Sequence, residues 1–271
     1  MSPRAVMLVV FGAVGGCSLL TPLGELSSGD DATPIVEGGV EAASPDAGAP
    51  DVATIDAEAG ADACTQTLCE SFDRDEPLTP AWTFEQKGVG PVLEVTPQAS
   101  VSPPNGLRVA VGPPGSERWS FLARSIAGPV KSARLDYALR VDRAPAVGEV
   151  EINIVRFNSG ATNHDYYLAI TKDSTRFVEQ RRGPPGDANI DVPFSPPIPF
   201  DKWTRVTFEI DFTGDKMLSV RVDGVEAARR AASFTPTSVV STYPTVGMNY
   251  VYELAGEASV VIDDYVLDLR R

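Results

Sequence analysis

The chain has 271 residues, with 37 acidic and 23 basic side chains and a formal net charge of −14. This balance argues against nucleic-acid binding, because phosphate backbones require a basic surface, and it equally disfavours attraction to an anionic membrane. No apolar run after residue 20 reaches the roughly 18 residues that a membrane-spanning helix needs.

The first 16 residues have the layout of an export signal, since Arg4 precedes an apolar stretch, residues 5–14, that is too short to cross a bilayer. The stretch ends in Val14-Gly15-Gly16-Cys17. This junction resembles the lipobox of bacterial lipoproteins, in which an aliphatic and two small residues precede the lipidated cysteine. The resemblance implies a lipid anchor on Cys17 and export to the bacterial cell envelope, with Ser18 favouring the outer membrane. The alternative is an ordinary secretory peptide with an incidental cysteine.

Residues 17–63 are predicted to form a disordered tether. From residue 18 onward they contain ten Asp and Glu residues, no Lys or Arg and no aromatic residue, and they are rich in Ala, Gly, Pro and Ser. Such a segment has too little apolar surface to offset the entropy lost on ordering. Its prolines interrupt the alternative structure, an acidic helix. We therefore expect one folded domain, over residues 64–271.

Two cysteines remain besides Cys17, namely Cys64 and Cys69. An even pair in an exported protein favours a disulfide. The alternative, a zinc site, would lack ligands because the chain has one histidine. We predict a small disulfide loop that pins the first strand.

Short strand patterns recur along the domain, separated by Gly and Pro clusters, and no segment shows a sustained helical period. Between Trp203 and Phe234 we expect three antiparallel strands, with Asp223-Gly224 as a tight hairpin turn. The apolar face of such a meander needs a second sheet over it. The predicted fold class is all-β, a two-sheet antiparallel β-sandwich (jelly roll). The other expected strands are 82–86, 107–111, 119–126, 133–141, 150–157, 164–170, 176–181, 245–250 and 258–269.

Three groups of residues carry a family resemblance: Leu68–Asp73 with Trp82, the pair Trp203–Phe208 and Leu218–Gly224, and the closing run Ile262–Leu267. They resemble the laminin-G-like jelly rolls of the concanavalin-A-like lectin/glucanase superfamily. The resemblance implies two packed sheets, one with a concave outer face that often binds carbohydrate.

Catalytic motifs are incomplete. Glucanases of this superfamily carry three acids on one strand, whereas Glu209-Ile210-Asp211 offers two, and the Glu149-Val150-Glu151 series ends at Asn153. His164 is similar to the His of polysaccharide lyases on this fold, yet no partner constellation is evident from the sequence. We therefore favour a protein that does no chemistry. The alternative is a glycan-cleaving enzyme, a glycoside hydrolase or a polysaccharide lyase.

Asp263 and Asp264 interrupt an apolar strand, where a carboxylate needs partners or an ion. Their oxygens suit Ca²⁺, which some laminin-G-like domains bind. The alternative is that they accept hydrogen bonds from backbone amides or pair with an arginine. We expect no other cofactor.

A polar sheet face is the remaining candidate site. If three predicted strands are neighbours, their polar positions bring arginine donors and an aromatic ring together, as sugar binding requires. The alternative is an ordinary solvated face. The predicted ligand face consists of Arg134, Asp136, Arg140, Glu151, Asn153 and Tyr167.

The function predicted from these features is that of a lipid-anchored, surface-exposed protein that binds a polysaccharide or another cell-surface partner. Contact with the membrane is expected through the lipid anchor only. A structural envelope module with no small ligand is a further alternative.

Overall fold

The computed structural model describes residues 65–73, 78, 81–88, 90–112, 118–252 and 256–271. The chain divides into two units, Met1–Ala57 and Glu58–Arg271, and every described residue belongs to the second. The predicted signal peptide, the lipidation site Cys17, the tether and Cys64 lie outside the described residues. Lipidation and the Cys64–Cys69 disulfide therefore stay predictions.

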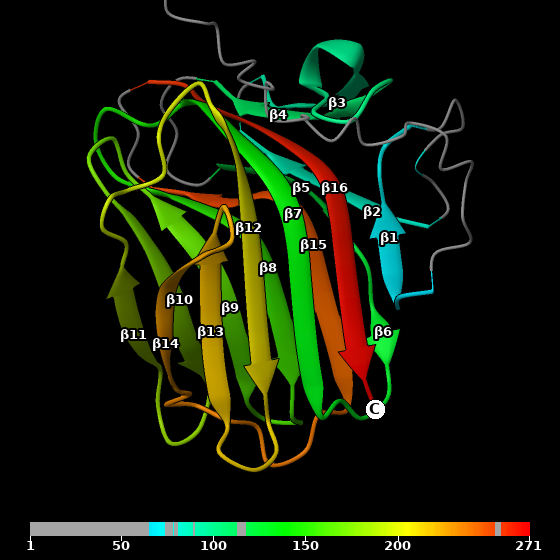
Figure 1. Ribbon diagram of the computed structural model, residues 1–271, viewed down its shortest axis with the longest axis vertical. Helices are drawn as coiled ribbons and strands as arrows, with labels where there is room; N and C mark the ends of the chain where they lie inside the picture. Colours follow the sequence, from blue (N-terminus) through cyan, green and yellow to red (C-terminus); the bar gives the residue numbers. More distant parts are fainter. Residues whose placement is uncertain (1–64, 74–77, 79–80, 89, 113–117, 253–255) are drawn as a thin grey trace, which may run out of the picture. The chain divides into compact units, whose positions relative to one another are not determined.

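Two eight-stranded antiparallel sheets, called sheet A and sheet B, lie face to face (Figure 1). Sheet A runs in the order β14-β13-β12-β7-β16-β4-β3, with β1 also paired to β16. Its strands are β1 (Leu68–Glu70), β3 (Val92–Thr96), β4 (Gly106–Val111), β7 (Ser132–Arg143), β12 (Trp203–Asp211), β13 (Met217–Val222), β14 (Val225–Ala231) and β16 (Ala258–Arg270).

Sheet B runs in the order β11-β10-β9-β8-β15-β5-β2, with β6 also paired to β15. The predicted all-β, two-sheet antiparallel sandwich is confirmed. One 3-10 turn, η1 (Pro97–Ala99), is the only helical element among the described residues. The strands of sheet B are β2 (Thr83–Lys87), β5 (Arg118–Ala123), β6 (Ile126–Ala127), β8 (Val150–Asn158), β9 (Asn163–Ile170), β10 (Thr175–Arg182), β11 (Ala188–Pro193) and β15 (Ser241–Val251).

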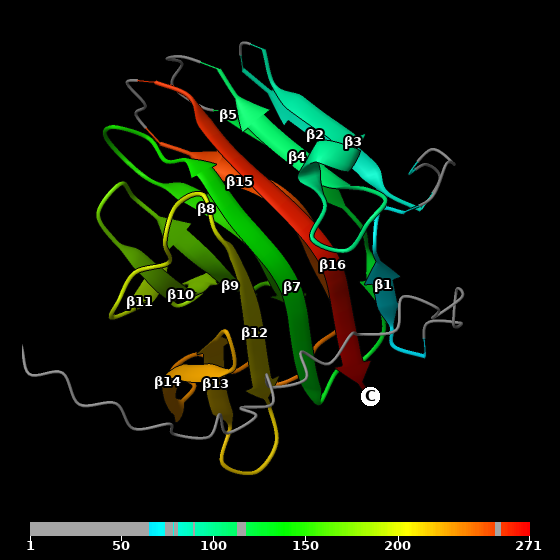
Figure 2. The same ribbon diagram turned by 45° about the horizontal axis from the view of Figure 1, so that its top comes forward.

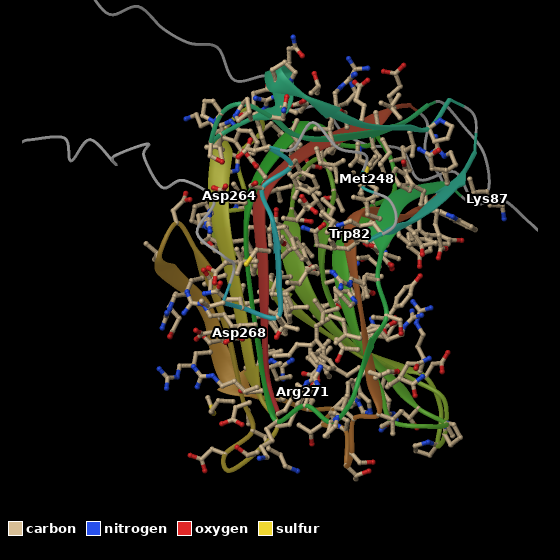
Figure 3. The ribbon with its side chains drawn as sticks, turned by 90° about the vertical axis from the view of Figure 1, so that its right-hand side faces the viewer. Trp82, Lys87, Met248, Asp264, Asp268 and Arg271 are labelled. Carbon is tan, nitrogen blue, oxygen red and sulfur yellow. The ribbon has the colours of Figure 1, made fainter. Side chains whose placement is uncertain are left out.

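Strict alternation explains how the sheets enclose one core. In β12, Val206, Phe208 and Ile210 are buried, and the residues between them face away from the second sheet. Met248 from β15 and Trp82 lie between the two layers (Figure 3) and belong to the same buried cluster. Burial of this apolar surface is the main force that holds the sheets together.

The three-stranded meander and its hairpin are confirmed. β12, β13 and β14 pair in sequence, and Asp223 and Gly224 have φ values of 50° and 77°. The closing strand β16 lies between β7 and β4 and also pairs with the first strand, β1, where Leu68 lies opposite Leu267 (Figure 2).

Three short strands, β3, β6 and β11, were not predicted from the sequence. β3 and β11 form sheet edges, where half-exposed side chains weaken the apolar alternation. The single strand expected over 119–126 is broken after Ala123, where the Arg124 amide bonds to the carbonyl of Pro244. Within the described residues, no helix is long and apolar enough to cross a membrane.

Candidate functional site

The six residues of the predicted ligand face do not share a face. β7 pairs with β12 and β16, whereas β8 pairs with β9 and β15. Arg134, Asp136 and Arg140 therefore lie on sheet A, while Glu151, Asn153 and Tyr167 lie on sheet B. The assumption that these strands are neighbours is wrong, because the chain crosses from one sheet to the other between β7 and β8.

The outer face of sheet A is covered by ion pairs among its own side chains. Arg134 donates from Nε to Asp136 Oδ2 (2.5 Å) and from Nη1 to Glu209 Oε1 (3.0 Å). Arg140 donates from Nε to Asp142 Oδ1 (2.6 Å), and its guanidinium lies over the Trp203 ring. The arginine donors predicted to meet a ligand are thus engaged by neighbours on the same face.

A β-bulge corrects the prediction for Asn153. The pairing register of β8 with β9 shifts between Ile152 and Val155, and Asn153 has a φ of 51°. The extra residue reverses the alternation, so Val155 joins the main core and Ile154 faces outward. Asn153 is buried, and its Oδ1 accepts a hydrogen bond from the Gly247 amide (2.8 Å). It is therefore a structural residue rather than part of an exposed face.

Tyr167 lies on the outer face as predicted but is only 5% exposed. It belongs to a small apolar cluster on that face with Ile154, Ala169 and Val178. Because its neighbours cover the ring, Tyr167 supports the face and does not offer a platform to a ligand.

The outer face of sheet B is hollowed by a cavity of about 540 Å³, here called the sheet-B hollow. Its lining combines charged, amide, hydroxyl and aromatic side chains from six strands and one loop. These residues are Glu85, Phe121, Ser125, Glu151, Ile154, Arg156, Asn158, Asn163, Arg182, Ser241, Tyr243, Thr245, Asn249 and Tyr250.

A fully buried carboxylate organises the basic side of the hollow. Asp165 of β9 accepts two hydrogen bonds from Arg156, at 2.7 Å from Nε and 2.9 Å from Nη2. It also pairs with Arg182 Nε at 3.3 Å. The hydrogen bond to Asp165 raises the pKa of Arg156, against the opposite effect of burial. Both guanidinium groups are therefore held in place, yet 31% and 40% of their side chains stay exposed.

Glu151 lies on the same face and is 3% exposed. Tyr252 donates from its hydroxyl to Glu151 Oε1 (3.2 Å). Burial raises the pKa of the Glu151 carboxyl, while Arg182 and hydrogen bonds from Tyr252 and Tyr167 oppose this effect. The sequence correctly placed Glu151 on an outer face, and the structure adds the partners that hold it there.

Tyr243 of β15 is the cross-strand neighbour of Arg156, and its hydroxyl donates to Glu85 Oε1 (2.7 Å). Burial and the nearby Glu85 raise the pKa of Tyr243 to about 12, and burial with Glu151 does the same for Tyr252. Both hydroxyls therefore remain protonated at neutral pH and act as hydrogen-bond donors.

A second cavity of about 470 Å³ lies at the β7–β8 loop and the β9–β10 turn. Tyr252 lines this second cavity, and its ring centroid lies 4.0 Å from that of Tyr250, which lines the hollow. The two cavities are thus lined by neighbouring tyrosine rings.

The remaining candidate residues lie away from this hollow. His164 is buried on the core side of β9, where burial lowers its pKa. Glu209 faces Arg134 on sheet A, and the Asp211 carboxylate accepts hydrogen bonds from Thr213. None of the three joins the tyrosines and arginines of sheet B.

Asp263 and Asp264 are held by backbone amides and by an arginine, which was the alternative to a Ca²⁺ site. Asp263 Oδ2 accepts hydrogen bonds from the amides of Val101 (2.8 Å) and Ser102 (3.0 Å). Asp264, on the outer side of β16 (Figure 3), pairs with Arg205 Nη1 at 3.1 Å. Among the described residues, no group of three or more His, Cys, Asp or Glu side chains could hold a metal ion.

Sequence reasoning missed the residues that define the hollow, above all Arg156, Asp165, Arg182, Tyr243 and Glu85. Asp165 and Tyr167 alternate with core residues in one predicted strand, which was a usable signal. Arg156 joins their face only because of the bulge at Asn153. Glu85 comes from β2, three strands away from β8 in the sheet.

The fold is shared with solved structures at low sequence identity. An endo-β-1,4-glucuronan lyase from the fungus Trichoderma reesei matches with a TM-score of 0.62 and 12% identity, covering 76% of this chain and 96% of that one. The cellulose-induced protein Cip1 matches with a TM-score of 0.54 and 13% identity, covering 74% and 96%. No protein-family model and no curated protein matches the sequence. The similarity shows that the chain shares the two-sheet jelly-roll fold of these structures.

Proposed function

We propose that this protein binds a polysaccharide in the sheet-B hollow and does no chemistry on it. The observation that carries the proposal is the hollow itself, in which guanidinium donors held by Asp165 lie among tyrosine rings and carboxylate acceptors. Sugars present hydroxyls to such donors and CH faces to such rings. The fold similarity to a glucuronan lyase is consistent with a carbohydrate ligand.

The presence of two cavities with neighbouring tyrosine rings favours an extended chain over a single sugar. Tyr250 lines the cavity of about 540 Å³ and Tyr252 lines the cavity of about 470 Å³, and their ring centroids are 4.0 Å apart. An extended polysaccharide can cross this pair with one sugar ring over the aromatic surface and its neighbours in the two cavities.

Polysaccharide cleavage by a lyase is the second candidate, and one observation favours it. Tyr243 and Arg156 are directly paired across β15 and β8, and a tyrosine beside a guanidinium can transfer a proton to or from a sugar. The raised pKa of Tyr243 and the position of His164 on the core side argue for binding instead. Release of products with a new carbon–carbon double bond, measured by ultraviolet absorbance, would establish the lyase.

The binding proposal is tested by retention of the purified protein on immobilised polysaccharides. Tyr250→Ala and Arg182→Ala remove a ring and a donor that line the hollow, and each is expected to weaken retention about tenfold. Arg134→Ala on the outer face of sheet A is the matched control and should leave retention unchanged. Equal retention of all three variants would contradict the site.

We also propose that the protein is exported and lipid-anchored at Cys17, on the strength of the Val14–Cys17 junction. Cys17→Ser should abolish lipid labelling and release the protein from the membrane fraction. Normal processing and unchanged fractionation of that variant would contradict the anchor.

A further inference from the structure

The charges around the sheet-B hollow narrow the class of polysaccharide. Two acidic and two basic side chains line it, Glu85 and Glu151 against Arg156 and Arg182. Asp165 adds a third carboxylate directly beneath the two guanidinium groups. The hollow therefore has no excess of positive charge.

The positive groups are also already paired. Asp165 is fully buried and holds Arg156 through two hydrogen bonds and Arg182 through one ion pair. A ligand carboxylate would have to share guanidinium groups that Asp165 already engages. A ligand hydroxyl needs only their exposed N–H groups, which the buried carboxylate orients.

The two glutamates that line the hollow disfavour binding of a negatively charged ligand. The Glu85 carboxylate accepts from Tyr243 on one side of the hollow, and Glu151 accepts from Tyr252 on another. Carboxylates are good acceptors for sugar hydroxyls, whereas a ligand carboxylate beside them would meet like charge. Burial raises the pKa of the Glu151 carboxyl, because loss of water at this position disfavours a negative charge.

We propose that the ligand of the sheet-B hollow is an uncharged polysaccharide, and that the hollow selects against polyuronates. This inference rests on the proposed binding function. It distinguishes the chain from the glucuronan lyase that shares its fold, which is named for an acidic polymer.

The test compares retention of the purified protein on uncharged gels (cellulose, mannan, xyloglucan) and on polyuronate gels (polyglucuronate, alginate), at low and high salt. Retention is expected on at least one uncharged polymer, with little dependence on salt. Retention on the polyuronates should be at least about tenfold weaker, because no excess positive charge draws them in.

A charge variant sharpens the test. The double variant Glu85→Gln, Glu151→Gln gives the hollow a net positive charge and should gain polyuronate retention on the order of tenfold at low salt, lost again at high salt. Glu85→Gln alone should gain less, and it serves if the double variant unfolds at a lower temperature. Glu209→Gln on sheet A is the matched control and should gain nothing.

The outcomes separate the two proposals. Stronger wild-type retention on polyuronates, lost with salt, overturns the inference and leaves polysaccharide binding intact. The same conclusion follows if the Gln variants gain no polyuronate retention. If no polymer of either class retains the protein, the binding function fails and the inference fails with it.

Discussion

The outer faces of the two sheets use similar side chains to opposite effect. On sheet A, Arg134 lies between Asp136 and Glu209, and 52% of its side chain is exposed. On sheet B, Arg156 and Arg182 converge on Asp165, which is fully buried. The outer face of sheet A therefore carries solvent-exposed ion pairs. The outer face of sheet B carries arginines that a buried carboxylate holds in place beside the sheet-B hollow.

The difference teaches which polar faces are built to meet a ligand. Exposed ion pairs contribute little to stability, because water can replace either partner at a small cost in free energy. A buried carboxylate that orients two partly exposed guanidinium groups costs desolvation, and among the described residues this arrangement occurs on the outer face of sheet B. Preorganised donors of this kind are expected where a ligand binds.

The largest effect is expected from removing the buried centre of sheet B. Asp165→Asn leaves Arg156 and Arg182 without their counter-charge. Breaking a buried ion pair in this way costs about 3–5 kcal/mol, and we expect the lower end because both guanidinium groups are partly exposed. Urea unfolding measures the loss. A loss below about 1 kcal/mol would mean that the ion pairs of Asp165 contribute no more to stability than the exposed ion pairs of sheet A.

The second effect concerns the bulge that shapes the hollow. Asn153→Ala removes the acceptor of the Gly247 amide and replaces Asn, which tolerates a φ of 51° better than most residues with a Cβ, by Ala, which does not. We expect a loss of about 2–3 kcal/mol from these two causes. Asn153→Gly keeps the loss of the acceptor but relieves the backbone, so it should be less destabilised than the Ala variant. Equal stability of the two variants would mean that the left-handed backbone carries no cost.

Much of the fold follows from sequence because alternation is strong in long, half-buried strands. In β7 and β12 every second residue is apolar, and the hairpin at Asp223-Gly224 requires two positive φ values that Asp and Gly tolerate. The edge strands β3 and β11 lack this signal, since few of their side chains reach the core.

The site was less predictable because it depends on which strands are neighbours in a sheet and on a bulge within one strand. Alternation shows which residues share a face of one strand, but it does not show which strands are neighbours, so Arg134 and Glu151 were placed together. The bulge at Asn153 then shifts the phase by one residue, which turns Ile154 and Arg156 toward the hollow. A short stretch of sequence shows neither which strands pair in a sheet nor where a bulge changes the side to which the side chains point.

A smaller effect is expected from Glu151 and depends on pH. Its pKa is raised in the folded protein, so the folded state loses stability relative to the unfolded chain as pH rises from the ordinary Glu range through the raised value. Glu151→Gln removes this penalty and keeps an acceptor for Tyr252. The variant should match the wild type at the acidic end of that window and exceed its stability above it, by about 1.4 kcal/mol for each unit of pKa shift. A difference between the two proteins that does not change with pH would contradict this assignment.

The smallest effect is expected on sheet A, where the same chemistry is exposed. Glu209→Gln removes the Arg134 Nη1 partner at 3.0 Å, but Arg134 keeps Asp136 and both members of the lost pair are more than one-third exposed. Such pairs contribute roughly 0–1 kcal/mol, and salt screens them. Urea unfolding at low and high salt should show a loss of less than about 1 kcal/mol that shrinks as salt is added. A loss as large as that of Asp165→Asn would mean that the ion pairs of sheet A are as firmly built as those of sheet B, and the contrast between the two faces would no longer identify the binding face.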